Sequence, residues 1–148
     1  MMYMHHELEE MACRVPAQCL GTAVRQLARR VTQTYDYYLG VVGLTLSQFN
    51  VMSAILLLQD EASAARIGRH LDADRSTISR EIALLVSREF VELGSTQGRT
   101  QCLGLSEKGE RVYLRAWEAW ETACGEIDRT YGVERSRDLC KTIHGMLG

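Results

Sequence analysis

Apolar side chains recur at spacings of three and four residues along most of this chain, which is the pattern of amphipathic helices. The first stripe indicates a helix over residues 16–39 and consists of Leu20, Val24, Leu27, Val31, Tyr35 and Tyr38. Pro16 lies where a helix can begin, because the first helical position needs no backbone donor. The first dozen residues are expected to fray, and the helix is expected to end near Gly40.

A second helix follows a capping signal. Thr45 and Gln48 have the spacing of a capping box, in which each side chain bonds to the backbone N–H of the other residue. The helix is expected to continue to about Leu58, and its apolar positions are Phe49, Met52, Ile55 and Leu56.

Two short helices joined by a tight turn come next. Ser63 is the expected N-cap of a helix that ends at Leu71, and Asp74 can cap a longer helix that runs to about Glu89. On a helical wheel the longer helix gathers Ile78, Ile82 and Leu85 in one narrow arc, which predicts its buried face. The opposite arc is small, polar and carries one arginine: Ser76, Arg80, Ala83 and Ser87, with Thr77 and Ser79 beside them.

The pattern then changes to strands and back to helices. The runs 90–93 and 102–105 read as short strands, and the polar segment 94–101 predicts the tip of a hairpin. Ser106 is expected to open a long helix, and a last helix carries Leu139, Ile143 and Leu147.

The element order predicts a mainly α fold with a small β-hairpin wing. A winged helix-turn-helix is expected at about 44–105, flanked by N- and C-terminal dimerisation helices at about 16–42 and 106–147. The length of 148 residues favours a single domain, 1–148.

Such a fold places its second short helix in the major groove of DNA and its hairpin tip against a neighbouring groove. The hydroxyls of Ser76, Thr77 and Ser79 can bond bases or phosphates. The planar fork of Arg80 matches the two acceptors of guanine. Three further candidates for DNA contact complete the set, namely Arg66, Arg75 and, at the hairpin tip, Arg99. The sequence therefore predicts double-stranded DNA as a partner.

Three motifs resemble those of the MarR-type winged-helix transcription regulators. Residues 43–49 (GLTLSQF) look like that family's entry to its second helix, 74–80 (DRSTISR) like the start of its recognition helix, and 105–109 (LSEKG) like its exit from the wing. The resemblance implies a homodimer that interleaves its terminal helices, and a ligand or oxidant signal that changes the spacing of its two DNA-reading lobes. Two positions depart from the family. Gln97 replaces an Asp that would orient the wing arginine, and Gly68 replaces an alanine, which lowers helix propensity.

The composition narrows the function further. A net charge of −2 excludes a broadly basic nucleic-acid binder, so any DNA contact must be local. The uncharged stretch 37–59 is long enough to span a bilayer. It contains polar residues that one membrane helix would bury without partners, so we expect two soluble helices and no membrane partner. The five cysteines form no CxxC pair and follow no secretory signal, which indicates a cytoplasmic protein with reduced thiols.

Catalytic chemistry has no candidate residues. The sequence contains no nucleophile elbow, no glycine-rich phosphate loop and no His or Cys set at metal-ligand spacing. We therefore expect neither an enzyme nor a metal or cofactor site.

The terminal stripes extend beyond what a small winged-helix core can cover, so we expect a two-fold symmetric homodimer, which would bind a pseudo-palindromic operator. The resemblance to the MarR-type regulators implies that it acts as a repressor. A pocket between the dimer helices and the DNA-binding lobe is predicted for a small aromatic or phenolic acid effector. Its expected lining is Tyr35, Tyr38, Phe49, Met52 and Trp117.

Two alternatives remain open. One is a thiol-based redox regulator, because some members of the family sense hydroperoxides through a cysteine near the start of the first helix, close to Cys19. An ungapped comparison instead puts the sensing position at Gly21, roughly 200° round the helix. Cys13 could serve as a resolving partner. The other alternative is a winged-helix protein-interaction module that does not bind DNA.

Overall fold

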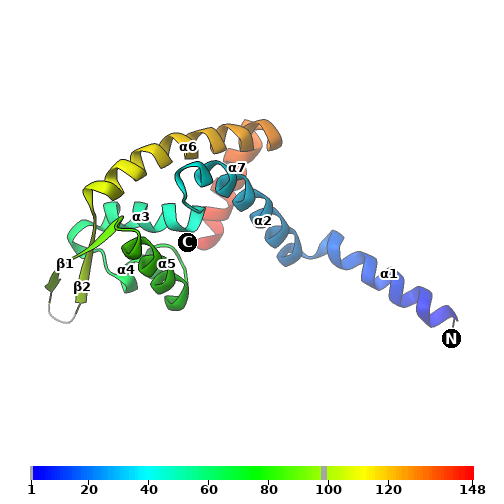
Figure 1. The fold of residues 1–148 in the computed structure, drawn as a ribbon. Coiled ribbons are helices and arrows are strands. Elements are labelled where there is room, and N and C mark those ends of the chain that lie inside the picture. The colour runs from blue at the N-terminus through cyan, green and yellow to red at the C-terminus, as the bar shows by residue number, and fades with distance from the viewer. Residues whose placement is uncertain (1, 98–99) are drawn as a thin grey trace. The chain divides into compact units, whose positions relative to one another are not determined.

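The computed structural model describes residues 2–97 and 100–148, and it is mostly helical with one hairpin (Figure 1). Residue contacts divide the chain into two compact units, 1–34 and 35–148, and each unit is described by itself. The expectation of a single domain stays a prediction.

The first unit holds α1 (Met2–Gln18) and most of α2 (Leu20–Leu39). The prediction that the first dozen residues fray and that a helix starts at Pro16 is wrong, because α1 is helical from Met2 and Pro16 lies in its last turn. Pro16 has no N–H, and its ring crowds the carbonyl four residues earlier. Helix α1 ends at Gln18, two residues after Pro16, and after Cys19 the chain starts α2.

The second unit contains the remaining elements. A 3-10 turn, η1 (Gly40–Val42), ends α2 where we predicted, and α3 (Leu46–Leu58) follows. Thr45 and Gln48 form the predicted capping box on α3. A further 3-10 turn, η2 (Gln59–Glu61), leads to the elements of the winged helix-turn-helix. These are α4 (Ala64–His70), α5 (Arg75–Ser87), β1 (Val91–Gln97) and β2 (Thr100–Leu105), followed by α6 (Glu107–Tyr131) and α7 (Val133–Leu147).

The core of this unit lies where α3, α4 and α5 meet the base of the hairpin. Its fully buried side chains include Met52 from α3, Ile67 from α4 and Leu85 from α5. Ala116 brings α6 into the same cluster. The helices that the capping residues define direct their apolar stripes into the same cluster. Local signals and long-range packing therefore favour the same helix-turn-helix.

The hairpin is longer than predicted. β1 and β2 pair antiparallel from Val91 opposite Leu105 to Gln97 opposite Thr100, with an irregularity between Leu93 and Thr96. The segment 94–101, which we expected to form a loop, is mostly strand. Polar residues carry the same backbone donors and acceptors as apolar ones, so the ladder continues into the tip.

Among the described residues, no single helix is both long and apolar enough to cross a bilayer. One bent pair, Leu20–Val42 with Leu46–Glu61, meets the criteria of length and composition only when its two parts are taken together.

Candidate nucleic-acid interface

Helices α4 and α5 and the turn between them form the candidate DNA-reading element. The Ser63 hydroxyl accepts from the N–H of Arg66 at 3.4 Å and caps α4, as predicted. The N–H of Ala73 donates to the carbonyl of Gly68 at 2.9 Å, and a Cβ on Gly68 would lie 3.3 Å from the Ala73 oxygen. The family's alanine would be tight here, so glycine suits this close approach of the turn to α4.

The two faces of α5 differ as the helical wheel predicts. Ile78 and Leu85 are buried, at 2% and 0% exposure, and Ile82 lies beside them at 9%. The opposite face is exposed and consists of Ser76, Ser79, Arg80, Ala83 and Ser87, while Thr77 is half-buried. Helix α5 therefore presents a small, hydroxylated surface with one central arginine.

The hydroxyls at the start of α5 are already engaged within the chain. Ser76 Oγ donates to Asp74 Oδ1 at 2.5 Å, and Thr77 Oγ1 donates to Asp74 Oδ2 at 2.6 Å. The N–H of Thr77 donates to Asp74 Oδ1 at 2.9 Å, which is the predicted N-cap. These hydrogen bonds, that from Ser76 foremost, hold the pKa of the Asp74 carboxyl far below its usual range. In this geometry Ser76 and Thr77 offer outward only acceptor lone pairs.

The arginines around the turn fall into two groups. Arg66 forms an ion pair with Glu61, and both side chains are about half exposed. Arg69, Arg75 and Arg80 are exposed, and no carboxylate of the described residues lies within ion-pair distance of them. Their charge is therefore available to an anionic partner, whereas that of Arg66 is shared.

The wing is tied to the segment before α4. The N–H of Leu103 donates to the carbonyl of Ala62 at 2.9 Å, and the Cys102 thiol donates to the carbonyl of Asp60 at 3.2 Å. Arg99, the predicted wing contact, lies outside the described residues, so its role stays a prediction.

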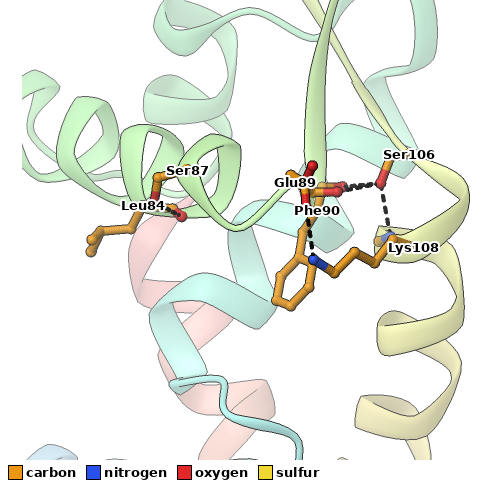
Figure 2. Close-up of polar contacts among 7 residues, drawn as sticks. Leu84, Ser87, Glu89, Phe90, Ser106 and Lys108 are labelled. Atoms are coloured by element: carbon orange, nitrogen blue, oxygen red, sulfur yellow. Dashed lines mark hydrogen bonds and ion pairs between the residues drawn. The ribbon is translucent and has the colours of Figure 1, made fainter.

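Figure 2 shows how the wing exit joins α5 to α6. Ser106 Oγ donates to the carbonyl of Glu89 at 2.6 Å and accepts from the N–H of Gly109 at 3.0 Å. Lys108 Nζ reaches Glu89 Oε2 at 3.0 Å. The motif at 105–109 is therefore a joint that fixes the direction of α6 relative to the DNA-reading element.

An aromatic groove lies between α3 and α6. It has a volume of about 440 Å³ and is lined by Phe49, Asn50, Ser53, Leu56, Leu57, Tyr113, Trp117 and Trp120. The rings of Phe49 and Tyr113 stack with centroids 5.1 Å apart, and Ser53 Oγ lies 3.1 Å from the Tyr113 hydroxyl. The groove offers apolar ring faces together with a pair of hydroxyls.

Of the five predicted pocket residues, the structure brings only Phe49 and Trp117 together in this groove. Tyr38 lines a separate hollow with Val42 and Arg115. Met52 is fully buried in the core. The Tyr35 hydroxyl lies 3.3 Å from Cys124 Sγ, and burial, followed by this contact, raises the Tyr35 pKa. The sequence shows which residues lie on the apolar face of each helix. It does not show the packing angle between two helices, and that angle decides which residues line one pocket.

Sequence reasoning missed the six other residues of the groove: Asn50, Ser53, Leu56, Leu57, Tyr113 and Trp120. The helical spacing of the aromatic residues on α6 was visible. The spacing does not show that these aromatic residues face the side of α3 that carries Ser53. Periodicity identifies the faces of a single helix and not the contacts between two helices.

The cysteines lie in different surroundings. Cys19 is exposed, and a hydrogen bond from the side chain of Thr22 lowers its pKa. Cys124 is half-buried, and burial raises its pKa. Cys13 is exposed on α1. Among residues 2–97 and 100–148 no group of three or more His, Cys, Asp or Glu side chains could hold a metal ion.

Comparisons with known proteins bear on the fold. No protein-family model matches this chain, and no curated protein matches its sequence. The transcriptional regulator MosR of M. tuberculosis matches with a TM-score of 0.74 and 22% identity, over 89% of this chain and 97% of that one. A mutant MarR from E. coli complexed with operator DNA matches with a TM-score of 0.79 and 17% identity, over 90% and 97%.

The transcriptional repressor CouR also matches, in two states. Bound to a 23-mer DNA duplex it gives a TM-score of 0.78 and 21% identity, over 90% of this chain and 96% of that one. Bound to p-coumaroyl-CoA it gives 0.76 and 20%, over 90% and 94%. At these identities the likeness concerns the fold, and the chain therefore has the winged-helix fold of the MarR-family regulators.

Proposed function

We propose that this chain is a MarR-family regulator that binds a pseudo-palindromic DNA operator as a homodimer and represses transcription. The observation that carries the proposal is the face of α5, where Arg80 and the small residues around it are exposed opposite the buried Ile78 and Leu85. The shared fold with MarR and CouR, both solved on DNA, supports it.

The arginines divide the work of binding. Arg80 projects from the middle of the exposed face and suits a bidentate contact to guanine O6 and N7. Arg69 and Arg75 lie at the ends of the turn and suit phosphate contacts, which position the protein without reading sequence. Because the chain is acidic overall, this local patch must supply the attraction, and a dimer presents it twice.

The aromatic groove is the proposed effector site. The ring faces of Phe49, Tyr113 and Trp117 suit a small aromatic or phenolic acid, and the Ser53–Tyr113 hydroxyl pair offers its polar end a partner. The CouR structure with p-coumaroyl-CoA supports ligand control on this fold. A ligand that prefers one spacing of the DNA-reading lobes would shift DNA affinity by its difference in affinity for the two forms.

Selection of random duplexes on the purified protein tests the DNA proposal. We expect a two-fold symmetric motif from the wild type and none from Arg80→Ala. Arg111→Ala, an exposed arginine on α6 paired with Glu107, is the matched control and should recover the wild-type motif. Failure to enrich any motif with a folded dimer would leave the protein-interaction module as the function.

The redox alternative has one observation in its favour, the exposed Cys19 with its lowered pKa. It is tested in the same selection by adding mild peroxide, with and without reductant. The protein would be a thiol-based regulator if peroxide weakens DNA binding, a reductant restores that binding, and the Cys19→Ser variant keeps its DNA binding in peroxide. Unchanged binding would reject the redox alternative.

A further inference from the structure

Helix α1 has an apolar face that nothing in the described part of the chain covers. Every residue from His5 to Gln18 is exposed, and Leu8, Met11 and Val15 are 57%, 60% and 56% exposed. Their spacing of three and four residues aligns them in one stripe. An exposed stripe of large apolar side chains favours a surface that packs on it.

The adjoining helix of the same chain cannot provide that surface. Cys19 is the only residue between α1 and α2, and helical hydrogen bonds run across it from Cys19 N to the Val15 carbonyl (2.9 Å) and from Ala23 N to the Cys19 carbonyl (3.1 Å). Two helices need a connection of about two to five residues to reverse direction. The stripe therefore needs a surface other than the adjoining helix.

The net charge of α1 indicates which kind of surface can pack on its apolar stripe. Helix α1 carries Glu7, Glu9 and Glu10 against Arg14, and no described ion pair involves them. This acidic helix is repelled by DNA and by anionic lipid. Residues 20–34 of α2 show the opposite pattern, with three arginines, no carboxylate and an exposed apolar stripe that includes Leu20 and Val24.

We propose that α1 packs antiparallel on α2 of a second copy of this chain, and that each copy contributes both helices to the contact. The proposal rests on the homodimer proposed above and adds the surface through which its N-terminal parts meet. An antiparallel pair brings the same flank of each stripe together. On a helical wheel Glu7 and Arg30 lie on the same flank of their apolar stripes.

One antiparallel register of α1 on α2 of the second copy aligns an opposite-charge pair and also the two apolar stripes. With the two-fold axis near Cys19, Glu7 meets Arg30 of the second copy, and Met11 falls between positions 24 and 27 of its apolar stripe. Val15 then falls beside Leu20. Apolar cover and the Glu7–Arg30 charge pair thus come from a single placement of two identical chains.

Sedimentation equilibrium of the full chain tests the placement. Met11→Asp puts a charge in the centre of the stripe, and we expect the dimer Kd to rise about tenfold or more, because the buried carboxylate has no partner. Cys13→Asp, two residues further along on the opposite side of α1, is the matched control and should change Kd by less than about twofold. Circular dichroism verifies that both variants keep their helix content.

A charge swap tests the register. Glu7→Arg and Arg30→Glu should each weaken the dimer about two- to fivefold at low salt, and the double variant should restore it. If Met11→Asp and the single charge variants leave the Kd of a wild-type dimer unchanged, the placement of α1 is wrong while the regulator proposal stands. A wild-type chain that is monomeric at micromolar concentration would overturn the homodimer as well. Co-sedimentation with phosphatidylcholine vesicles that Met11→Asp abolishes, at unchanged dimer Kd, would overturn the placement in favour of a lipid surface.

Discussion

Gly109 lies so close to Phe90 that a Cβ atom on it would overlap the Phe90 carbonyl oxygen. The neighbouring atom belongs to backbone at the start of the wing, so it cannot rotate away as a flexible side chain would. Gly109→Ala must push the start of α6 off the base of β1. We expect the free energy of unfolding to fall by about 1 to 3 kcal/mol, the usual cost of overpacking a well-packed contact, measured by urea denaturation.

Gly125 on the same helix is the control for that experiment. A Cβ there would meet no heavy atom within 4 Å. Gly125→Ala should therefore stabilise the protein by about 0.5 to 1 kcal/mol, because alanine favours the helix and lowers the entropy of the unfolded chain. Equal effects of the two substitutions would contradict a steric role for Gly109.

Asp74 makes stability depend on pH in acid. Hydrogen bonds from Ser76 and Thr77 stabilise its carboxylate and lower its pKa in the folded state. Its contribution is therefore fully present above the unfolded pKa and is lost as pH falls through the folded pKa. Below about pH 4 the stability of the wild type should converge on that of Asp74→Asn, and the gap should be widest near pH 7.

Thermal unfolding of both proteins between pH 2.5 and pH 7 measures this gap. Asp72→Asn, in the same turn, is the control. If the difference in stability between the wild type and Asp74→Asn stays constant over that pH range, the N-cap does not depend on the charge of the Asp74 carboxylate.

The local elements could be predicted from sequence because their causes are local. The caps at Thr45, Ser63 and Asp74 and the buried arc of α5 each depend on residues a few positions apart. The Pro16 prediction failed for an equally physical reason. Proline is tolerated in the first turn of a helix, but it is also found where a helix is about to end, and position alone does not separate the two.

The groove could not be predicted in the same way. Its lining depends on which sides of α3 and α6 face each other, and that is set by long-range packing around Ala116 and by the joint at Gly109. The hydrogen bonds of Ser76 and Thr77 to Asp74 were likewise hidden, although all three residues had been singled out. Which donor meets which acceptor depends on side-chain rotamers that the sequence does not specify.

Arg80 and Arg66 should separate sequence readout from general attraction. Arg80→Ala is expected to lower the preference of the protein for its selected operator over a scrambled duplex by about 1 to 3 kcal/mol. Arg66 lies on α4, outside the exposed face of α5, and forms an ion pair with Glu61. Arg66→Ala removes a positive charge and leaves the Glu61 carboxylate without its partner, so it should weaken both duplexes alike. Fluorescence anisotropy at two salt concentrations measures both effects. The same loss of preference in both variants would argue against Arg80 as the base-reading residue.

Met52 supports the core and not a ligand. Its side chain is fully buried among the core residues of α3 and its neighbours. Met52→Ala should lower the free energy of unfolding by about 2 to 5 kcal/mol through the lost burial and the cavity. Met146→Ala is the control, because Met146 is 72% exposed and its loss should change stability by less than about 0.5 kcal/mol. A mild effect at Met52, matching that at Met146, would return this residue to the list of ligand contacts.

Cys19 and Cys124 should differ in reactivity because the thiolate is the reacting species. The Thr22 hydrogen bond lowers the pKa of Cys19, which is exposed, and burial raises the pKa of Cys124, which also lies 3.3 Å from the Tyr35 hydroxyl. At pH 7.5 Cys19 should react with iodoacetamide faster than Cys124, because Cys19 is exposed and a larger fraction of its thiol is ionised. Peptide mass spectrometry over time measures both rates in one sample. Thr22→Val should slow Cys19 and leave Cys124 unchanged, and equal rates in the wild type would remove the physical basis for a reactive Cys19.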